Sequence, residues 1–400
     1  HDLELECGIY NSKLRDVATG DDNAIHNVAY LDNYRLGKSV ILFNVQEMSC
    51  TKHSKFGNGI LKEGESEDIR IWIGVGNENG NRSVLPFETM IPADAFLWSR
   101  YREDKLLMQR FVELTESGND KKNNTYGIVS DDAVIKNCTL IKDAKIGKNV
   151  VISPCSFIAE HVEIGDNCWI GPFVTINDYV KIGSGCKIFN GAVIGAIPQD
   201  LKYSGEVSYV EIGDNVTIRE CATINRGTQA SGKGVTKIDS DTLIMSYVHV
   251  AHDCHVGSHC IMTSHSAIAG ETDIEDYAIL GGGAMCHQFT HIGTHAMVGG
   301  ASKVNKDIPP YVLCGRDPIC YCGVNIVGLR RRGFASEDIR IIKDIYDTIY
   351  FQGYNITDGC SKVEAGFPQS EYRDTILNFI RASKRGIIRG SEVGERGQID

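Results

Sequence analysis

Isoleucine recurs at every sixth position through the middle of the chain. The series contains Ile146, Ile152, Ile158, Ile164, Ile170, Ile176, Ile182, Ile188 and Ile194. A six-residue period is neither the 3.6-residue period of an α-helix nor the two-residue alternation of a strand. It predicts a prism in which each six-residue unit is a short strand plus a turn, three units make one coil, and the isoleucines stack inside.

Two interruptions divide this series without ending it. Ile212, Ile218 and Ile224 keep the original phase, so residues 195–209 are predicted to be a loop inserted between coils. A second loop, at about residues 225–236, shifts the phase by two residues. The later inward positions are Ile238, Ile244, Val250, Val256, Met262, Ile268, Ile274, Leu280, Cys286, Ile292, Val298 and Val304, and Leu140 and Val134 are predicted to continue the series towards the N-terminus.

Helical patterns replace the period after Pro309-Pro310. A helix is expected from Ser336, with apolar residues at four-residue spacing from Ile341 to Ile349, and a second amphipathic run covers about 370–389. We expect residues 313–400 to form a C-terminal helical domain and tail, because the open strand edges at the end of a stacked coil must be covered.

Composition narrows the classes of function. The net charge of -11 gives no support for nucleic-acid binding, and no apolar stretch approaches the ~18 residues of a membrane span. The first residues lack the pattern of a secretory signal, and the 14 cysteines include no CxxC. We therefore expect a cytoplasmic protein with reduced thiols, and Cys168, Cys186 and Cys260 are expected to be small corner residues of the prism.

Polar residues gather in register on one part of the predicted prism. Positions 18 apart lie on adjacent strands about 4.8 Å apart, so His252, Gly270 and Gln288 form one column. Asp253 and Glu271 form the next column. A histidine can accept a proton from a sugar hydroxyl, and a glycine allows a thioester carbonyl to approach a backbone N–H. The alternative is that these are ordinary surface residues of a prism.

The motifs IPQDLKYSGE, RECATINRGT, VHVAHDCHVG, LGGGAMCHQF and GVNIVGLRRRGF occur in order and closely resemble the UDP-N-acetylglucosamine acyltransferases of lipid A biosynthesis. The resemblance implies a homotrimer of left-handed parallel β-helices with C-terminal helical domains and active sites between subunits. It implies transfer of a 3-hydroxyacyl chain from acyl carrier protein to UDP-N-acetylglucosamine. No cofactor, metal or nucleic acid is expected.

The same resemblance assigns roles to individual residues. His252 resembles the general base, Asp253 its partner, and Gly270 the backbone donor to the thioester oxyanion. The residues that resemble substrate contacts are Asp200, Lys202, His249, Gly282, His287, Gln288, Asn325, Arg331 and Arg332. Arg330, Arg331 and Arg332 could dock an acidic carrier protein or bind diphosphate, and the alternative is a solvated charge run.

Three positions bear on specificity. Glu271 stands where some members of the family have histidine, and Val327 where glutamate is frequent. Both departures affect contacts to the sugar or nucleotide rather than His252. Gly300 falls where the family sets acyl length, and a glycine there leaves room for a long acyl chain.

Residues 1–126 lie outside this resemblance, which places the acyltransferase β-helix at 127–312. The extension carries a weak hexapeptide rhythm with Leu36 and Leu42, an alternating stretch at 69–75 and a helix near 93–116. Its motifs, from EMSCTKHSKFGNGILKEGE to PADAFLWSRYREDK, resemble an uncharacterised bacterial hexapeptide-protein family. Cys50, His53 and His26 could bind a metal, but structural roles are the simpler expectation.

Five other functions are compatible with parts of the pattern. The later N-acyltransferase of the same pathway lacks the QDLKY loop and the two-part helical C-terminus. A coenzyme A-dependent sugar acetyltransferase, or a related enzyme acting on another nucleotide sugar, would share the prism. A carbonic anhydrase-type metal site could use His249, His252 and His287. A non-catalytic scaffold would not need the His252 column.

Overall fold

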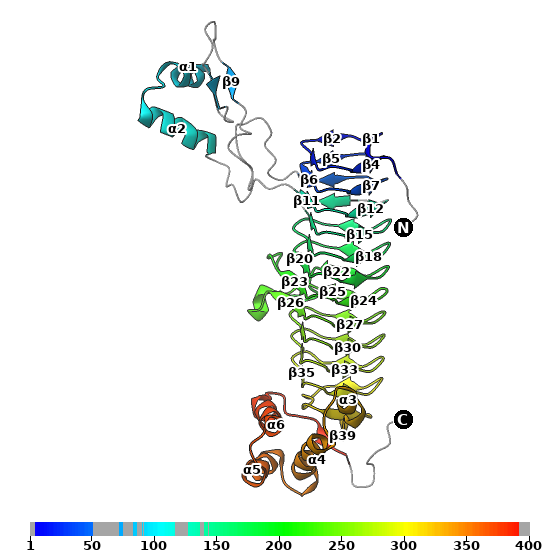
Figure 1. Ribbon diagram of the computed structural model, residues 1–400. Coiled ribbons are helices and arrows are strands. Elements are labelled where there is room, and N and C mark those ends of the chain that lie inside the picture. Colours follow the sequence, from blue (N-terminus) through cyan, green and yellow to red (C-terminus); the bar gives the residue numbers. More distant parts are fainter. Residues whose placement is uncertain are drawn as a thin grey trace.

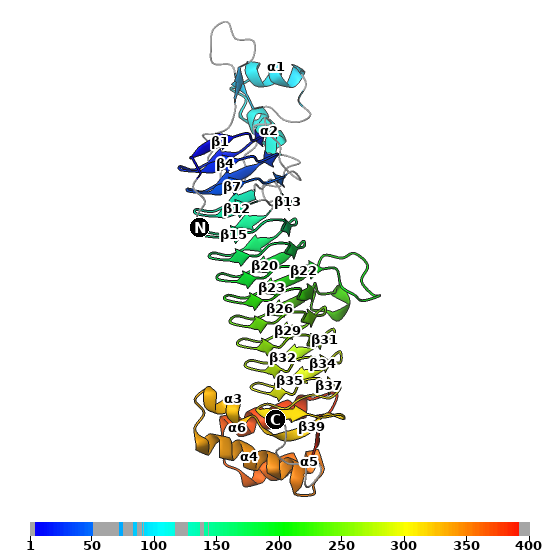
Figure 2. The ribbon, with the colours of Figure 1, turned by 90° about the vertical axis from the view of Figure 1, so that its right-hand side faces the viewer.

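The computed structural model describes residues 5–50, 72–74, 83–85, 90, 92–116, 127–136, 140–142 and 144–391. These residues form one long three-sided prism of parallel strands, with a small helical module projecting near one end and a helical domain closing the other (Figures 1 and 2). Three sheets run the length of the prism and are called A, B and C in chain order.

Each coil contributes one strand to each sheet. Sheet A contains β1 (Gly8–Tyr10), β4 (Ala24–His26), β7 (Ile41–Phe43), β12 (Val134–Lys136), β15 (Val151–Ile152), β18 (Trp169–Ile170), β21 (Lys187–Ile188), β24 (Thr217–Ile218), β27 (Leu243–Ile244), β30 (Ile261–Met262), β33 (Ile279–Leu280), β36 (Met297–Val298), β38 (Val312–Gly315), β39 (Cys320–Val324) and β40 (Arg389–Gly390). Sheet B contains β2 (Leu14–Arg15), β5 (Leu31–Asp32), β8 (Met48–Ser49), β13 (Leu140–Lys142), β16 (Phe157–Ile158), β19 (Thr175–Ile176), β22 (Val193–Ala196), β25 (Thr223–Asn225), β28 (His249–Val250), β31 (Ala267–Ile268), β34 (Met285–Cys286) and β37 (Lys303–Val304). Sheet C contains β3 (Ala18–Thr19), β6 (Tyr34–Leu36), β11 (Gly127–Val129), β14 (Lys145–Ile146), β17 (Glu163–Ile164), β20 (Val180–Ile182), β23 (Tyr209–Ile212), β26 (Val235–Ile238), β29 (His255–Val256), β32 (Asp273–Ile274) and β35 (His291–Ile292).

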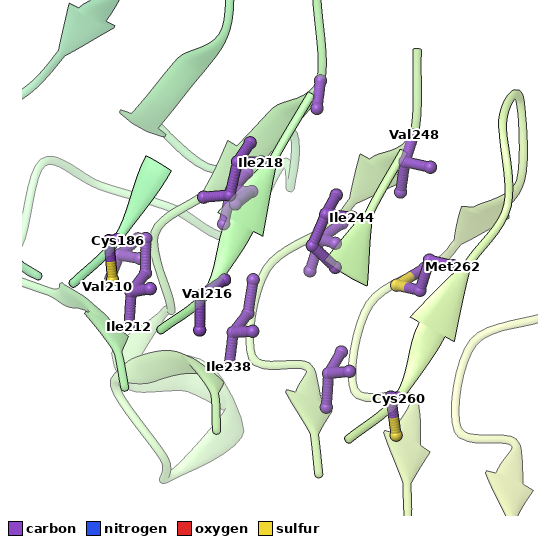
Figure 3. Packing of buried hydrophobic residues seen from close by; sticks show 14 of the residues in the cluster. Cys186, Val210, Ile212, Val216, Ile218, Ile238, Ile244, Val248, Cys260 and Met262 are labelled. Atoms are coloured by element: carbon purple, nitrogen blue, oxygen red, sulfur yellow. The ribbon is translucent and has the colours of Figure 1, made fainter. Parts of the chain in front are cut away.

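The prism interior is built from the predicted apolar series. Every inward position predicted from Ile146 to Val304 is buried, and the side chains of successive coils stack on one another (Figure 3). Each such side chain contributes roughly 1.5–3 kcal/mol of hydrophobic stabilisation relative to exposure. The predicted loops are also confirmed, since β22 and β23 are separated by residues 197–208 and β25 and β26 by 226–234.

The turns between sheets form three corners, called A–B, B–C and C–A. One residue of most turns has a left-handed backbone, as at Asn167 (φ 60°) and Asp253 (φ 60°). Asparagine and aspartate adopt this conformation more readily than most residues. Cys168, Cys186 and Cys260 are buried at the C–A corner, and each thiol donates a hydrogen bond of 3.1 Å to a carbonyl of the next coil. The structure thus gives them the expected structural role.

Strand pairing does not follow the boundary predicted at residues 126 and 127. β6 pairs with β11, β7 with β12 and β8 with β13, all in parallel, so residues 8–49 form the first coils of the same prism. Leu36 and Leu42 are buried, as their weak hexapeptide rhythm predicts. The segment that interrupts the prism is 51–126, which leaves sheet B after β8 and returns to sheet C at β11.

The prediction that Val134 and Leu140 point inwards is wrong by one residue. Ile135 is fully buried and pairs with Ile152, and Ile141 pairs with Ile158. The step from Ile141 to Ile146 across the B–C corner therefore contains five residues instead of six. Leu31 and Leu36 are separated by the same five-residue step, so the N-terminal coils are one residue shorter than those beyond Ile146.

In its described residues, the inserted module contains two helices where one was predicted. α1 (Pro92–Arg100) and α2 (Lys105–Glu116) are separated at Asp104, whose carboxylate accepts hydrogen bonds from the next turn. Val84, Leu85, Trp98 and Phe111 form a small core beside the antiparallel pair β9 (Ile73–Gly74) and β10 (Ser83–Val84). Of the stretch predicted to alternate at 69–75, only 72–74 are described.

The C-terminal domain covers the last coil. Its helices are α3 (Ile326–Arg331), α4 (Ser336–Phe351), α5 (Ile356–Gly366) and α6 (Glu371–Ala382), of which α4 and α6 match the predicted runs. The antiparallel pair β38–β39 extends sheet A, and the Tyr346 hydroxyl donates to the Pro310 carbonyl at 2.6 Å. In the described part of the chain, no helix has the length and apolar character needed to cross a membrane.

Candidate active site

The B–C corner carries the insertions of the prism. Residues 51–126, 197–208 and 226–234 all leave sheet B and return to sheet C. In Figure 1, the module with α1 and α2 and the green loops project from the same side of the prism. The coils next to the two later loops present His252 at this corner, between β28 and β29.

His252 is partly buried, and one of its two ring nitrogens lies within hydrogen-bonding distance of a buried carboxylate. Its Nδ1 lies 2.8 Å from Asp253 Oδ2, and its Nε2 lies 3.9 Å from Asp200 Oδ2. The side chain is 15% exposed, whereas that of Asp253 is fully buried. A carboxylate at Nδ1 favours the tautomer with the proton on Nδ1, which leaves Nε2 as the basic nitrogen. His252 can therefore accept a proton from a group at the surface.

Gly270 lies directly beneath the imidazole. A Cβ at this position would come within 2.5 Å of both Cε1 and Nε2 of His252. The Phe289 N–H donates to the Gly270 carbonyl at 3.1 Å, and the Glu271 N–H donates to that of His252 at 3.0 Å. These contacts confirm the predicted stacking of His252, Gly270 and Gln288. The close contact with the ring requires a glycine here, because any larger residue would displace His252.

The loop 197–208 brings one predicted residue to His252. Asp200 approaches Nε2, and its Oδ1 accepts a hydrogen bond of 2.9 Å from the Lys202 N–H. Asn225 holds the start of the loop, donating from Nδ2 to the Ile197 carbonyl at 2.6 Å. Lys202 itself is exposed. The Asp200 carboxylate, which lies 3.9 Å from Nε2, would also stabilise an imidazolium formed when His252 accepts a proton.

Other predicted residues lie along sheet B and its borders. His249 Nδ1 lies 2.8 Å from Thr223 Oγ1, and burial together with the nearby His252 lowers the pKa of His249. His287 is exposed and its Nδ1 lies 3.1 Å from the Gln288 carbonyl, which also accepts from Arg385 at 3.1 Å. Arg385 was not predicted, because no periodicity relates the C-terminal tail to this corner.

Gly282 and Gly300 lie at the A–B corner, at the opposite border of sheet B from His252. They are exposed neighbours on successive coils, and a Cβ at Gly300 would lie 3.2 Å from the Gly282 carbonyl oxygen. Between the two borders, sheet B presents Ala267 and Met285, of which Met285 is 53% exposed. Between His252 and these glycines, the face of sheet B therefore carries a small and an apolar side chain, flanked by His249 on β28 and Lys303 on β37.

Asn325, Arg331 and Arg332 are not brought to His252 within one chain. Asn325 caps α3 and donates from Nδ2 to the carbonyl of His295, a residue of the C–A corner, at 2.9 Å. Arg332 lies over the Tyr277 ring at the same corner, 5.3 Å from its centroid. Burial and the Arg332 guanidinium lower the pKa of His295 to about 4. Apart from Gly282 and Gly300 at the A–B corner, the predicted residues therefore form two groups, one near the B–C corner and one near the C–A corner.

The C–A group borders a pocket of about 590 Å³. Its walls come from the outward face of sheet A, from α3 and from α4, and its lining includes Ile279, Met297, Asn325, Val327, Arg331 and Lys343. Val327 is 60% exposed. Lys343 pairs with Asp347 at 2.8 Å in this lining, and Arg331 adds a guanidinium group to an otherwise mainly apolar surface. Such a pocket suits a ligand with an apolar part and an anionic group. Among the described residues there is no group of three or more side chains arranged to hold a metal, and His53 of the predicted cluster lies outside them.

Comparison with known proteins decides the family. An acyl-acyl carrier protein–UDP-N-acetylglucosamine O-acyltransferase of Janthinobacterium sp. (strain Marseille) is 44% identical over 207 residues, which are 51% of this chain and 79% of the relative. This chain belongs to the UDP-N-acetylglucosamine O-acyltransferase family. The profile of domain 2 of that family matches residues 307–388, and a domain of unknown function, DUF4954, matches residues 2–197.

Solved members of the family share the fold. The UDP-N-acetylglucosamine acyltransferase from Bacteroides fragilis 9343 is 50% identical with a TM-score of 0.61, over 62% of this chain and 96% of that chain. The Arabidopsis enzyme is 28% identical with a TM-score of 0.63, over 66% and 96% of the two chains. The predicted left-handed parallel β-helix is confirmed, and so is the resemblance of the N-terminal segment to an uncharacterised family.

The contact between Gly270 and His252 yields a direct prediction. Gly270→Ala is expected to reduce acyl transfer at least about 100-fold, because the new methyl group displaces the His252 imidazole, with little change in thermal unfolding. Gly366→Ala is the matched control, since a Cβ there would have no neighbour within 4 Å. Full activity of a folded Gly270→Ala protein would contradict this geometry.

Proposed function

We propose that this chain transfers an (R)-3-hydroxyacyl group from acyl carrier protein to the glucosamine 3-hydroxyl of UDP-N-acetylglucosamine, the first step of lipid A biosynthesis. The observation that carries the proposal is the His252–Asp253 pair stacked on Gly270, in a chain that is 44% identical to an acyltransferase of that name. We assign the reaction to the coils beyond residue 127 and substrate contacts to the C-terminal domain as well.

In the proposed reaction, His252 Nε2 removes the proton of the 3-hydroxyl as its oxygen attacks the thioester carbonyl carbon. The Asp253 carboxylate stabilises the imidazolium. Collapse of the tetrahedral intermediate breaks the carbon–sulfur bond, and the imidazolium returns the proton to the leaving thiolate. The backbone N–H of Gly270 stabilises the oxyanion. Within the described part of the chain, the Gly270 N–H donates to no protein acceptor, so it is available to an oxyanion.

The remaining site residues fit this arrangement. Asp200 and Lys202 lie on the loop over His252 and would contact the sugar and the acyl donor, while His249, His287 and Gln288 line the face that both approach. The acyl chain would run along sheet B towards Gly282 and Gly300. Asn325, Arg331 and Arg332 would meet the nucleotide or the carrier protein, since the guanidinium group binds phosphate oxygens in pairs.

The reaction itself is tested with a long-chain 3-hydroxyacyl carrier protein and UDP-N-acetylglucosamine. The wild-type protein should form the 3-O-acyl product, and His252→Ala should lose about 10²–10⁴-fold in kcat, because the general base is removed. His161→Ala, an exposed histidine at the same B–C corner but four coils before His252, is the matched control. A folded wild-type protein that forms no product would refute the proposed function.

Acyl length should depend on the A–B corner. Gly300→Met would fill the space beside Gly282, so it should shift preference towards shorter donors by at least about tenfold, measured as the ratio of kcat/KM for long and short chains. Activity with short donors serves as the internal control for folding. An unchanged preference for long chains would place the end of the acyl chain elsewhere.

The division of predicted residues between two corners supports a homotrimer. The outward residues of sheet A are mostly apolar and half-buried, among them Ile41, Val134, Val151, Trp169, Leu243, Ile261, Ile279 and Met297. The matching column of sheet C is charged: Lys145, Glu163, Lys181, Glu211, Lys237, His255, Asp273 and His291. If sheet A faces a three-fold axis, sheet B of one subunit lies beside the C–A corner of the next, so each site would use both corners.

Shared sites can be tested by complementation. His252→Ala and Arg331→Ala should each be nearly inactive alone, whereas oligomers assembled from equal amounts of both should regain about a quarter of wild-type activity, because some interfaces pair two intact halves. Light scattering should give a mass three times that of the 44.0 kDa chain. A monomer, or no recovery on mixing, would contradict a shared site.

We place the reaction in the cytoplasm, where reduced thiols persist. All the described cysteines are free, and most of them are buried. Recovery of the protein in the soluble cytoplasmic fraction of the cell is the expected result of fractionation.

A further inference from the structure

The loop 226–234 has no role in the reaction described so far, yet it contacts Asp253 from the coil that precedes His252. It leaves the B–C corner after β25, one coil from His252, and contains a short 3-10 helix at Gln229–Ser231. Thr228 precedes this helix and is 1% exposed. A threonine buried at an inserted loop calls for a partner for its hydroxyl group.

That partner is Asp253. The backbone N–H of Thr228 donates to Asp253 Oδ1 at 2.8 Å, and its hydroxyl donates to Asp253 Oδ2, also at 2.8 Å. Oδ2 is the oxygen that lies 2.8 Å from His252 Nδ1. Thr228 and His252 therefore share one carboxylate oxygen, inside a region from which water is excluded.

The surrounding contacts leave Asp253 little freedom. A Cβ at Gly227 would lie 2.7 Å from Asp253 Oδ1 and closer still to the Val235 nitrogen, so the loop backbone is pressed against the carboxylate. The Asp253 N–H donates to Thr236 Oγ1 at 2.8 Å, and Lys233 Nζ donates to the Asp253 carbonyl at 3.2 Å. Asp253 itself has a left-handed backbone, with φ 60°.

We propose that Thr228 is a positioning residue for acyl transfer, whose N–H and hydroxyl hold the Asp253 carboxylate in the orientation that keeps the proton of His252 on Nδ1. The inference rests on the proposed function, in which His252 Nε2 is the general base. Thr228 does not touch substrate and acts only through Asp253. The loop 226–234 is thereby part of the catalytic apparatus.

The chemical reason is that a buried carboxylate needs donors to remain ionised and fixed. Hydrogen bonds from Thr228 stabilise the charged form, and the fork of one N–H and one O–H sets the plane of the carboxylate. Without the hydroxyl, Oδ2 keeps only the bond to His252, and the carboxylate can rotate within its pocket. A rotated carboxylate no longer selects the tautomer that leaves Nε2 basic.

The test is a double-mutant cycle on acyl transfer in the full-length protein. Thr228→Val removes the hydroxyl and keeps the N–H, and it is expected to lower kcat about 10- to 100-fold with KM unchanged, the range for a hydrogen bond to a buried charge. Thr228→Ser restores the donor and should retain near wild-type kcat. In an Asp253→Asn background, Thr228→Val should produce no further loss, because its partner is already altered.

Thr242→Val is the matched structural control. Thr242 is 1% exposed and donates at 2.8 Å to the Gly257 carbonyl, but its side-chain hydrogen bonds reach neither Asp253 nor a residue that lines the pocket beside α3. Its valine variant should keep wild-type kcat. Thr228→Ala replaces Thr228→Val if the valine variant does not fold. If neither folds while Thr242→Val does, Thr228 is structural and the inference is overturned.

Two other outcomes would decide whether Thr228 positions the Asp253 carboxylate. Full kcat in a folded Thr228→Val protein, or losses that add to those of Asp253→Asn, would overturn the positioning role and leave the acyltransferase function intact. A wild-type protein that transfers no acyl group would instead refute the function itself. The two failures are distinguished by the wild-type and His252→Ala rates measured in the same assay.

Discussion

The hydrogen-bonded register between successive coils is the constraint on which the rest of the structure depends. Val250 pairs with Ile224 on one side and Ile268 on the other, and the same alignment continues through Cys286. Because strand side chains alternate between faces, a slip by one residue would turn the apolar series outwards and the polar residues inwards. The register that fills the prism therefore also places Gly270 under His252.

The sequence was sufficient for those parts of the fold and site that repeat. Ile146 to Val304, the two loops and the column of His252, Gly270 and Gln288 all follow from counting in steps of six. The N-terminal coils do not follow from the same count, because they contain a five-residue step at the B–C corner. This step changes the phase, so Val134 was predicted to point inwards in place of Ile135. Thr228 and Arg385 were missed for a different reason. Each of their contacts joins a segment outside the six-residue repeat to a coil of the prism. No spacing in the sequence therefore relates Thr228 to Asp253 or Arg385 to Gln288.

The three corners divide the chemistry of the prism. The B–C corner holds the His252–Asp253 pair and the inserted loops. At the C–A corner, His259, Tyr277 and His295 stack with ring centroids 4.7 Å apart, beneath Arg332. Since the pKa of His295 is lowered to about 4, its imidazole is neutral at pH 7 and does not repel the guanidinium. A neutral His295 beside this ring stack can therefore support the Arg332 side chain.

The insertion of residues 51–126 between β8 and β11 has a consequence for how the molecule fluctuates. In a stacked coil, each turn contacts only the turns before and after it, so a disturbance weakens with every coil it crosses. Several coils of sheet B, from β13 to β25, separate this insertion from β28 and His252. Opening of the N-terminal coils would therefore exchange their amide hydrogens early, while those around His252 remain protected. The prism gives the chain a gradient of local stability, in which large additions can be accepted at one end without loosening the site near the other.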